Sequence, residues 1–236
     1  MPRIVLIHGL GSSARSWDAV LPLLGDEAVE AVDLPRDARR IEDMAEHVAG
    51  LDLSGAVVAG HSMGGLVAVA LAERAPAAVA SLVLVNSPPT YASRLTARSG
   101  SERIIRTPGV GPLLWKAASA DRLRAGLESA FASGFDVPTV FVEDLKATPW
   151  SAFVRSTKAI DAYLSERPLA ERVGALPVPA TVVFGEEDRR VDPASLAGYD
   201  GLREVSVVRL PGVGHTPIWE QPEAVAEAIR RRAGRP

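Results

Sequence analysis

The feature that most limits how this chain can fold is Leu53–Ala72, a stretch of 20 residues without a charged side chain. A stretch of this length could span a lipid bilayer as one helix. Its centre, however, is the polar, glycine-rich sequence Gly-His-Ser-Met-Gly-Gly at 60–65. Such a break favours a buried strand, a tight turn and a buried helix over one continuous span. The apolar run Ile4–Ile7 is too short for the core of a signal peptide. We therefore expect a soluble, cytoplasmic protein that does not enter a membrane.

Short β-branched runs alternate with longer helical patterns over much of the chain. Most of the predicted strands are apolar on both faces, as parallel strands between two helical layers are. The predicted strands are Arg3–Ile7, Val29–Val32, Ala56–Ala59, Ser81–Val85, Ala180–Phe184 and Val205–Leu210. Helical patterns occupy Trp17–Leu24, Ile41–Leu51, Met63–Arg74 and Pro222–Arg232. This alternation predicts an α/β fold with a doubly wound, mainly parallel sheet of about six strands.

The alternation stops between Pro88 and Pro168, where the sequence shows mostly helical patterns. Thr148 and Pro149 predict a helix start, with the threonine as N-cap and the proline at the first helical position. The segment is long for a simple crossover connection, which favours a helical lid over a plain helical layer. We therefore predict a core formed by residues 1–87 and 169–236 and a helical lid formed by residues 88–168.

Composition excludes several classes of function. Lys and Arg number 26 against 29 Asp and Glu, so no basic field is available to hold a nucleic-acid backbone. The chain has no cysteine, which removes disulfides, thiolate metal sites and a cysteine nucleophile. Its four histidines lack the short spacing of a zinc motif. We expect neither a metal ion nor a cofactor.

The most specific motif is Gly60-His61-Ser62-Met63-Gly64, placed between a predicted strand and a predicted helix. Gly-x-Ser-x-Gly in this context is the pattern of a nucleophile elbow, which exposes the serine hydroxyl at the carboxyl edge of a sheet. A phosphate-binding loop would also be rich in glycine, but it would need a lysine before the serine or threonine. The pattern therefore predicts that Ser62 is a nucleophile.

A serine nucleophile needs a base, and the base needs a group that orients it. His215 lies in Gly212-Val-Gly-His, directly after the last predicted strand, and is the best placed base. A carboxylate is expected after Ala180–Phe184, where Asp188 has the better reach and Asp192 is the alternative. Asp192 also fits as the N-cap of a helix that starts at Pro193. Ser81–Val85 ends in Asn86-Ser87 and offers no carboxylate.

Cleavage of an acyl group also needs N–H donors for the oxyanion that forms. We predict the backbone amide of Met63 as one donor and that of Leu10, in the turn after the first strand, as the other. Gly9 allows the backbone to approach the substrate closely, and His8 is expected to brace this turn.

Aromatic residues of the predicted lid are candidates for the substrate cavity. We assign Trp115, Trp150 and Phe153 to substrate binding, together with His8 and Gly9 of the turn after the first strand. For the three aromatic residues, packing of the lid onto the sheet is the alternative. Arginines gather at the start of the lid, at positions 94, 98, 103 and 106. They favour a solvated charged face, with binding of a substrate carboxylate or phosphate as the alternative.

Four motifs together resemble the α/β-hydrolase superfamily over essentially the whole chain outside the lid. They are His-Gly-Leu-Gly-Ser-Ser at 8–13, Gly-His-Ser-Met-Gly-Gly at 60–65, Phe-Gly-Glu-Glu-Asp at 184–188 and Gly-Val-Gly-His-Thr-Pro-Ile-Trp-Glu-Gln-Pro-Glu at 212–223. The resemblance is nearest to small esterases, lactonases and C–C hydrolases. It implies Ser62, Asp188 and His215 as a triad, and the amides of Leu10 and Met63 as the oxyanion hole.

The resemblance also implies a lid after Ser81–Val85 and a strand order of 2-1-3-4-5-6. This chain departs from the family in two places. The first predicted strand begins at residue 3, so we expect the N-terminal hairpin of many members to be absent and Val29–Val32 to be an edge strand. The glycine-rich loop expected after Asp33-Leu34-Pro35 is replaced by Arg36-Asp-Ala-Arg-Arg40.

The main hypothesis is therefore a serine hydrolase that cleaves a small carboxylic ester or lactone through an acyl-enzyme. One alternative keeps the triad and changes the reaction to C–C bond hydrolysis or a lyase step. The other is a binding protein that retains the fold without turnover. The sequence leaves a homodimer open and gives no sign of a nucleic-acid partner.

Overall fold

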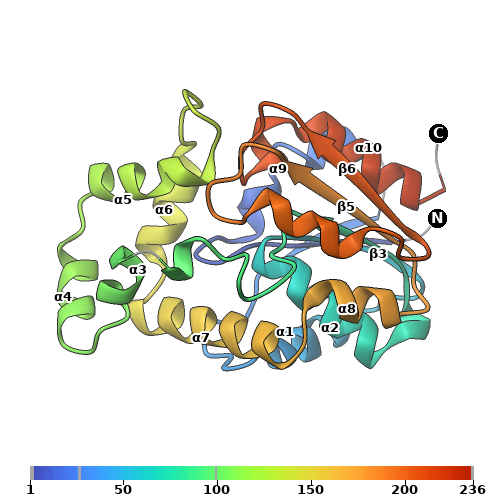
Figure 1. The fold of residues 1–236 in the computed structure, drawn as a ribbon, viewed down its shortest axis with the longest axis horizontal. Coiled ribbons are helices and arrows are strands. Elements are labelled where there is room, and N and C mark those ends of the chain that lie inside the picture. Colours follow the sequence, from blue (N-terminus) through green and yellow to red (C-terminus); the bar gives the residue numbers. More distant parts are fainter. Residues whose placement is uncertain (1–2, 26–27, 99, 235–236) are drawn as a thin grey trace.

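The sheet has six parallel strands in the order β2-β1-β3-β4-β5-β6. It is seen in a computed structural model that describes residues 3–25, 28–98 and 100–234. The strands are β1 (Ile4–Ile7), β2 (Val29–Val32), β3 (Ala56–His61), β4 (Val79–Val85), β5 (Ala180–Gly185) and β6 (Val205–Leu210). The parallel α/β fold and the strand order are confirmed. Helices lie on both faces of the sheet, and further helices extend from one end of it (Figure 1).

Side chains alternate between the two faces of the sheet, because successive residues of a strand point to opposite sides. Leu82 and Leu84 of β4 belong to one buried cluster, and Val83 and Val85 belong to the other. The first cluster includes residues of α1 (Ile41–Ala49), α2 (Met63–Arg74) and α8 (Leu169–Ala175). The second includes residues of α10 (Pro222–Arg232) and of the short turns η1 (Ala14–Trp17) and η2 (Leu21–Leu24).

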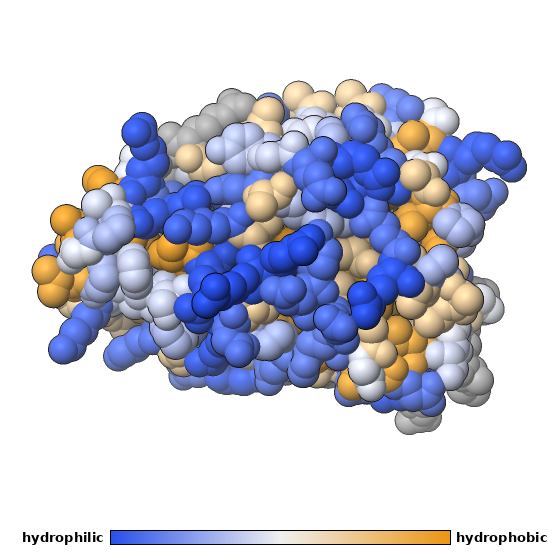
Figure 2. Space-filling model, turned by 90° about the horizontal axis from the view of Figure 1, so that it is seen from below, coloured by the Kyte–Doolittle hydropathy of each residue, from blue (hydrophilic) through white to orange (hydrophobic). Residues whose placement is uncertain are grey.

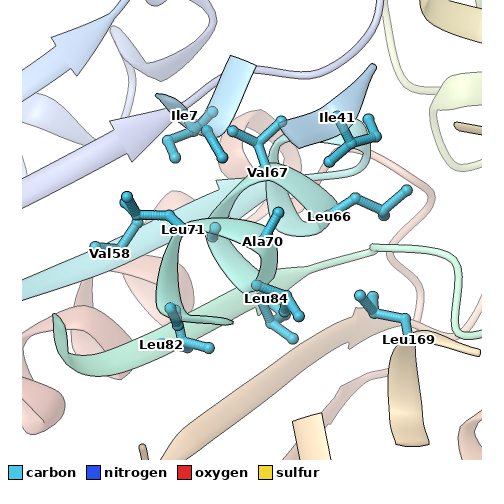
Figure 3. Packing of buried hydrophobic residues seen from close by; sticks show 14 of the residues in the cluster. Ile7, Ile41, Val58, Leu66, Val67, Ala70, Leu71, Leu82, Leu84 and Leu169 are labelled. Atoms are coloured by element: carbon cyan, nitrogen blue, oxygen red, sulfur yellow. The ribbon is translucent and has the colours of Figure 1, made fainter. Parts of the chain in front are cut away.

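Helix α2 carries apolar residues around its whole circumference, so it is buried rather than amphipathic. Figure 3 shows Leu66, Val67, Ala70 and Leu71 of this helix among side chains of β1, β3, β4 and α1. A leucine side chain buried in this way contributes about 1.5–3 kcal/mol. The uncharged stretch of the sequence is thus a central strand and a central helix, and its glycine-rich middle is the turn between them.

The segment between β4 and α8 contains only helices and turns in its described part, apart from an isolated bridge between Arg94 and Val191. Its helices are α3 (Gly100–Ile105), α4 (Val110–Ala117), α5 (Ala120–Leu127), α6 (Thr139–Ala147) and α7 (Trp150–Glu166). Glu73 of α2 links the end of this segment to the core, since it accepts hydrogen bonds from Tyr163 and Arg167 of the segment and from Arg172 of α8.

Two local predictions are wrong. Trp17–Leu24 forms no single helix but the separate 3-10 turns η1 and η2, because Pro22 cannot donate the hydrogen bond that a continuing helix needs. Thr148 does not cap α7. Its hydroxyl donates to the carbonyl of Asp144 at 2.8 Å, at the end of α6, and Pro149 takes the N-cap position instead.

The molecular surface is uneven in polarity. Figure 2 shows a largely hydrophilic face with hydrophobic atoms at the end where α4 lies in Figure 1 and also toward the opposite end. The exposed apolar residues of α3, α4 and the loop between them are Ile104, Val110, Leu113 and Leu114. At the β2 edge of the sheet, Glu30 forms an ion pair with Arg3. None of the helices in the described ranges is long and apolar enough to cross a membrane.

Candidate active site

Ser62 lies in a strained turn between β3 and α2. Its φ of 53° and ψ of −115° are rare for a residue with a side chain, and such conformations concentrate at functional sites. Gly64 makes the turn feasible, because a Cβ there would come within 2.2 Å of the carbonyl oxygen of Ile7. The turn therefore holds the serine at the carboxyl end of β3, directly before the first residue of a helix.

His215 contacts the hydroxyl of Ser62 from the loop after β6. Its Nε2 lies 3.0 Å from Oγ of Ser62, although 153 residues separate the two in sequence. Gly214 lets this loop pass close to its neighbours, since a Cβ there would lie 2.4 Å from the backbone nitrogen of Ala132. The imidazole is buried, with 5% of its residue surface exposed.

Asp188 completes the chain of hydrogen bonds at the end of β5. Its Oδ2 lies 2.7 Å from Nδ1 of His215. Its Oδ1 accepts from the backbone N–H groups of Arg190 and Val191. Burial alone would raise the pKa of Asp188, but the neighbouring His215 and the donated hydrogen bonds outweigh it and lower this pKa. Asp188 thus stays ionised and fixed in orientation.

The alternative carboxylate, Asp192, lies elsewhere. It accepts a hydrogen bond from the backbone N–H of Ala194 at 3.0 Å and forms the N-cap of the turn Pro193–Tyr199. Its side chain is therefore engaged in starting that turn, and the geometry favours Asp188 as the partner of His215.

Asn86 is a residue of this site that sequence reasoning missed. It is fully buried after β4, and its Nδ2 donates to Oδ2 of Asp188 at 2.7 Å. Its Oδ1 accepts from the backbone N–H of Gly185 at 3.0 Å. Its φ of 45° lies in the left-handed region, which asparagine tolerates better than most residues. Asn86 therefore connects the ends of β4 and β5 and orients Asp188.

Glu220 of α9 (Pro217–Glu220) was also missed. Its carboxylate accepts from the backbone N–H groups on both sides of His215, at Gly214 (2.9 Å) and Thr216 (3.0 Å). It also accepts from the N–H of Ala132 at 2.7 Å. The sequence motif after His215 contains this glutamate, but only the fold shows that one carboxylate joins the histidine loop to the helical segment.

The turn after β1 packs against Ser62. A Cβ at Gly9 would lie 3.3 Å from Cβ of Ser62, so the backbone here approaches the serine closely. Gly9, Leu10 and Met63 line a cavity of about 80 Å³ that also contains Ser62 and His215. Met63 is the first residue of α2, where backbone N–H groups have no partner within the helix.

His8 and His61 hold the backbone near Ser62 and His215 in place through hydrogen bonds. Nε2 of His8 accepts from the N–H of Leu34, and its Nδ1 lies 2.8 Å from the carbonyl of Gly9. Nε2 of His61 lies 2.9 Å from the carbonyl of His215. Burial lowers the pKa of His8 and lowers that of His61 to about 3, so both rings are neutral at pH 7.

The aromatic residues assigned to substrate binding lie in different places. Phe153 lines a neighbouring cavity of about 200 Å³ with His8, Leu10 and Met63. Trp115 and Trp150 instead line a cavity within the helical segment, away from Ser62. Their indole N–H groups donate to the carbonyls of Thr148 and Ile105. The structure therefore does not bring these two tryptophans to the serine, because they pack the helices of the segment together.

The arginines at the start of the helical segment do not form one solvated face. Arg94 is buried, lines the cavity at Ser62 and pairs with Asp161 and Glu102. Arg106 pairs with the same two acids, whereas Arg103 is exposed. The side chain of Arg98 lies outside the part of the chain that the structure describes.

Among the residues that the structure describes, no group of three or more His, Cys, Asp or Glu side chains could hold a metal ion.

The chain belongs to the alpha/beta hydrolase family, whose model matches residues 4–228. It is 38% identical to a pimeloyl-(acyl-carrier protein) methyl ester esterase of Klebsiella pneumoniae, over 96% of this chain and 91% of that protein. It is 27% identical to the esterase Rv0045c of Mycobacterium tuberculosis, over 97% of this chain and 82% of that protein. Among solved structures, a thermophilic esterase from Thermogutta terrifontis matches 99% of this chain and 90% of its own, at 25% identity and a TM-score of 0.70. The protein is therefore an enzyme of the hydrolase class.

Proposed function

We propose that this protein is a serine esterase, which cleaves a small carboxylic ester through Ser62, His215 and Asp188. The observation that carries the proposal is the continuous hydrogen-bonded chain of these residues, with 3.0 Å from serine to imidazole and 2.7 Å from imidazole to carboxylate. The relatives named as esterases support the same reaction. Lactone hydrolysis would use the same chemistry on a cyclic ester.

In the proposed reaction, Oγ of Ser62 attacks the ester carbonyl while Nε2 of His215 takes its proton. The proton then passes from His215 to the leaving alcohol, and an acyl-enzyme remains on Ser62. Water attacks this acyl group, again with His215 as base, and releases the acid. Asp188 keeps the imidazole in the required tautomer and stabilises its positive charge, as its lowered pKa favours.

The oxyanion of each tetrahedral intermediate would be bound by the backbone N–H groups of Leu10 and Met63. Both residues line the cavity at Ser62. One such donor is typically worth about 10²–10³ in rate. No metal or cofactor is needed for any step of this mechanism.

We further propose that residues 88–168 act as a lid over a core of residues 1–87 and 169–236. The support is that residues from α5, α6 and α7 (Leu127, Phe141 and Ile160) line the cavity at Ser62. The cavity is small and largely apolar on this side, which suits a small acyl group.

The cytoplasmic location and a homodimeric state stay predictions.

The proposal is tested with a series of 4-nitrophenyl esters of increasing acyl length, comparing the wild type with Ser62→Ala. We expect the variant to lose activity by about 10⁴-fold or more, since it lacks the nucleophile. Labelling of the wild type, but not of Ser62→Ala, by a fluorophosphonate would show an activated serine. Equal turnover by both proteins would disprove the proposal, and absence of labelling would favour a binding protein.

A further inference from the structure

One arginine that lines the cavity at Ser62 donates its side-chain hydrogen bonds to neutral acceptors in the described part of the chain. Arg190 lines this cavity and follows Asp188 by two residues. Its Nε donates to Oγ of Ser129 at 3.2 Å, and its Nη2 donates to the carbonyl of Gly126 at 3.1 Å. Both acceptors are neutral. Within the described ranges, no carboxylate oxygen pairs with this guanidinium, and its Nη1 has no hydrogen-bond acceptor.

The other arginine of the same cavity differs in this respect. Arg94 pairs with Asp161 and lies 3.5 Å from Glu102. These two acids compensate the charge of Arg94 and that of Arg106. Arg94 therefore has counter-ions within the protein, and Arg190 is the cation of this cavity that is left with neutral partners in the described part.

Asp188 is close to Arg190 in sequence but does not serve as its partner. Its carboxylate already accepts hydrogen bonds from His215, Asn86 and the backbone N–H groups of residues 190 and 191. The backbone of Arg190 thus belongs to the support of Asp188, whereas its side chain turns to the helical segment and the cavity. A side-chain substitution leaves the backbone donor in place.

Arg190 is partly buried, and a charge that loses part of its hydration without gaining a direct ion pair is less stable than the same charge in an ion pair. Burial lowers the pKa of Arg190, although the charges of Asp188 and Glu102 act in the opposite direction. The unused N–H groups of a guanidinium form a planar fork that matches a carboxylate. A ligand that brings a carboxylate into the cavity would supply such an ion pair.

We propose that Arg190 binds a carboxylate on the substrate, so that the preferred esters carry a free carboxylate in addition to the scissile ester. This inference rests on the proposed esterase function and specifies its substrate class. The carboxylate belongs either to the acyl part or to the alcohol part of the ester, and the substrates below separate these two cases.

Two matched pairs of esters test the proposal. Ethyl hydrogen adipate and ethyl hexanoate differ by a carboxylate in place of a methyl group at the end of the acyl chain. 5-Acetoxypentanoate and pentyl acetate differ in the same way in the alcohol part. Hydrolysis is followed by titration of the released acid. We expect the wild type to prefer the charged member of one pair by about tenfold or more in kcat/KM.

Arg190→Gln should abolish this preference, because kcat/KM falls by about tenfold or more for the charged ester relative to its neutral partner. Arg189→Gln is the matched control, because Arg189 also binds the helical segment, through the carbonyls of Glu128 and Phe131, but does not line the cavity at Ser62. This control should keep the preference. A purely structural role of Arg190 would instead lower the rates of charged and neutral esters alike.

A measurement without turnover separates this inference from the proposed function. Calorimetric titration of Ser62→Ala with ethyl hydrogen adipate and with 5-acetoxypentanoate should show binding of at least one, which addition of Arg190→Gln weakens about tenfold. Binding without any turnover by the wild type would support the carboxylate site and refute the esterase proposal. The inference is overturned if the wild type hydrolyses the esters but shows no preference in either pair, or if Arg190→Gln retains the preference or the affinity.

Discussion

Ser62, His215 and the neighbouring Asn86 differ in how far the role of a side chain can be predicted from sequence. The glycine-flanked serine and the glycine-flanked histidine carry local signals, because sharp turns and close approaches leave glycines around them. Asn86 carries no such signal. Its importance comes from a contact with Asp188 across 102 residues, and the sequence showed only that β4 ends without a carboxylate.

Substitution of Asn86 separates its role in orienting Asp188 from a role in folding. Asn86→Asp places a second carboxylate against Asp188, which raises the pKa of Asp188 where the asparagine now helps to lower it. We expect the acid limb of the pH profile of kcat/KM, measured with a 4-nitrophenyl ester, to move up by about one pH unit.

Asn86→Gly is the control for this experiment. Glycine accepts the positive φ of position 86 and removes the amide without adding charge, so kcat/KM should fall about tenfold while the acid limb moves less than in Asn86→Asp. Identical pH profiles for Asn86→Asp and the wild type would contradict the assigned role.

At the scale of elements, strands were predicted better than the segments between them. Strands that are apolar on both faces have few alternatives, and all six occur within two residues of their predicted ends. Short turns depend on single residues instead. Pro22 divides the predicted helix Trp17–Leu24, and the hydroxyl of Thr148 bonds backward to α6 rather than forward to α7. Trp115 and Trp150 could not be placed, because aromatic residues at helical spacing fit a packed segment and a cavity wall equally well.

Helix α9 gives a prediction at this scale, since Glu220 joins it to the loop of His215 and to residue 132. Glu220→Gln keeps the shape of the side chain but replaces an acceptor oxygen by an NH₂ group, so at least one backbone N–H loses its acceptor. We expect a loss of about 1–3 kcal/mol in the free energy of unfolding, measured in urea.

The same variant should lower kcat more than it raises KM for a nitrophenyl ester, because the histidine loop is displaced from Ser62. Glu223→Gln, an exposed neighbour in α10, is the control and should leave both quantities nearly unchanged. A variant at 220 that loses stability but keeps kcat would restrict Glu220 to a structural role.

For the whole molecule, the two buried histidines predict acid sensitivity. His61 has a pKa of about 3 in the folded protein, against 6.5 for an exposed histidine. Above about pH 6.5 both states are neutral and the folded state keeps its full stability. As the pH falls below 6.5 the unfolded chain takes up a proton that the folded chain refuses, so stability decreases toward pH 3.

We expect His61 alone to cost about 1.4 kcal/mol of unfolding free energy between pH 7.5 and pH 5.5. His8 adds to the slope, because its pKa is lowered too. Urea unfolding at several pH values measures the slope, and His61→Gln should reduce it whatever its effect on stability at pH 7.5. An unchanged slope in that variant would contradict neutral burial of His61.

The first strand and the last helix of the described chain both have their outer ends at the pole of the molecule away from the helical segment (Figure 1). Arg232, the last residue of α10, bonds to the carbonyl of Ala180 at the start of β5, and β1 begins at Ile4. Ser62 lies at the opposite edge of the sheet, where the strands end. An affinity tag, a fused domain or an anchoring surface attached at either end would thus leave the cavity mouth unobstructed.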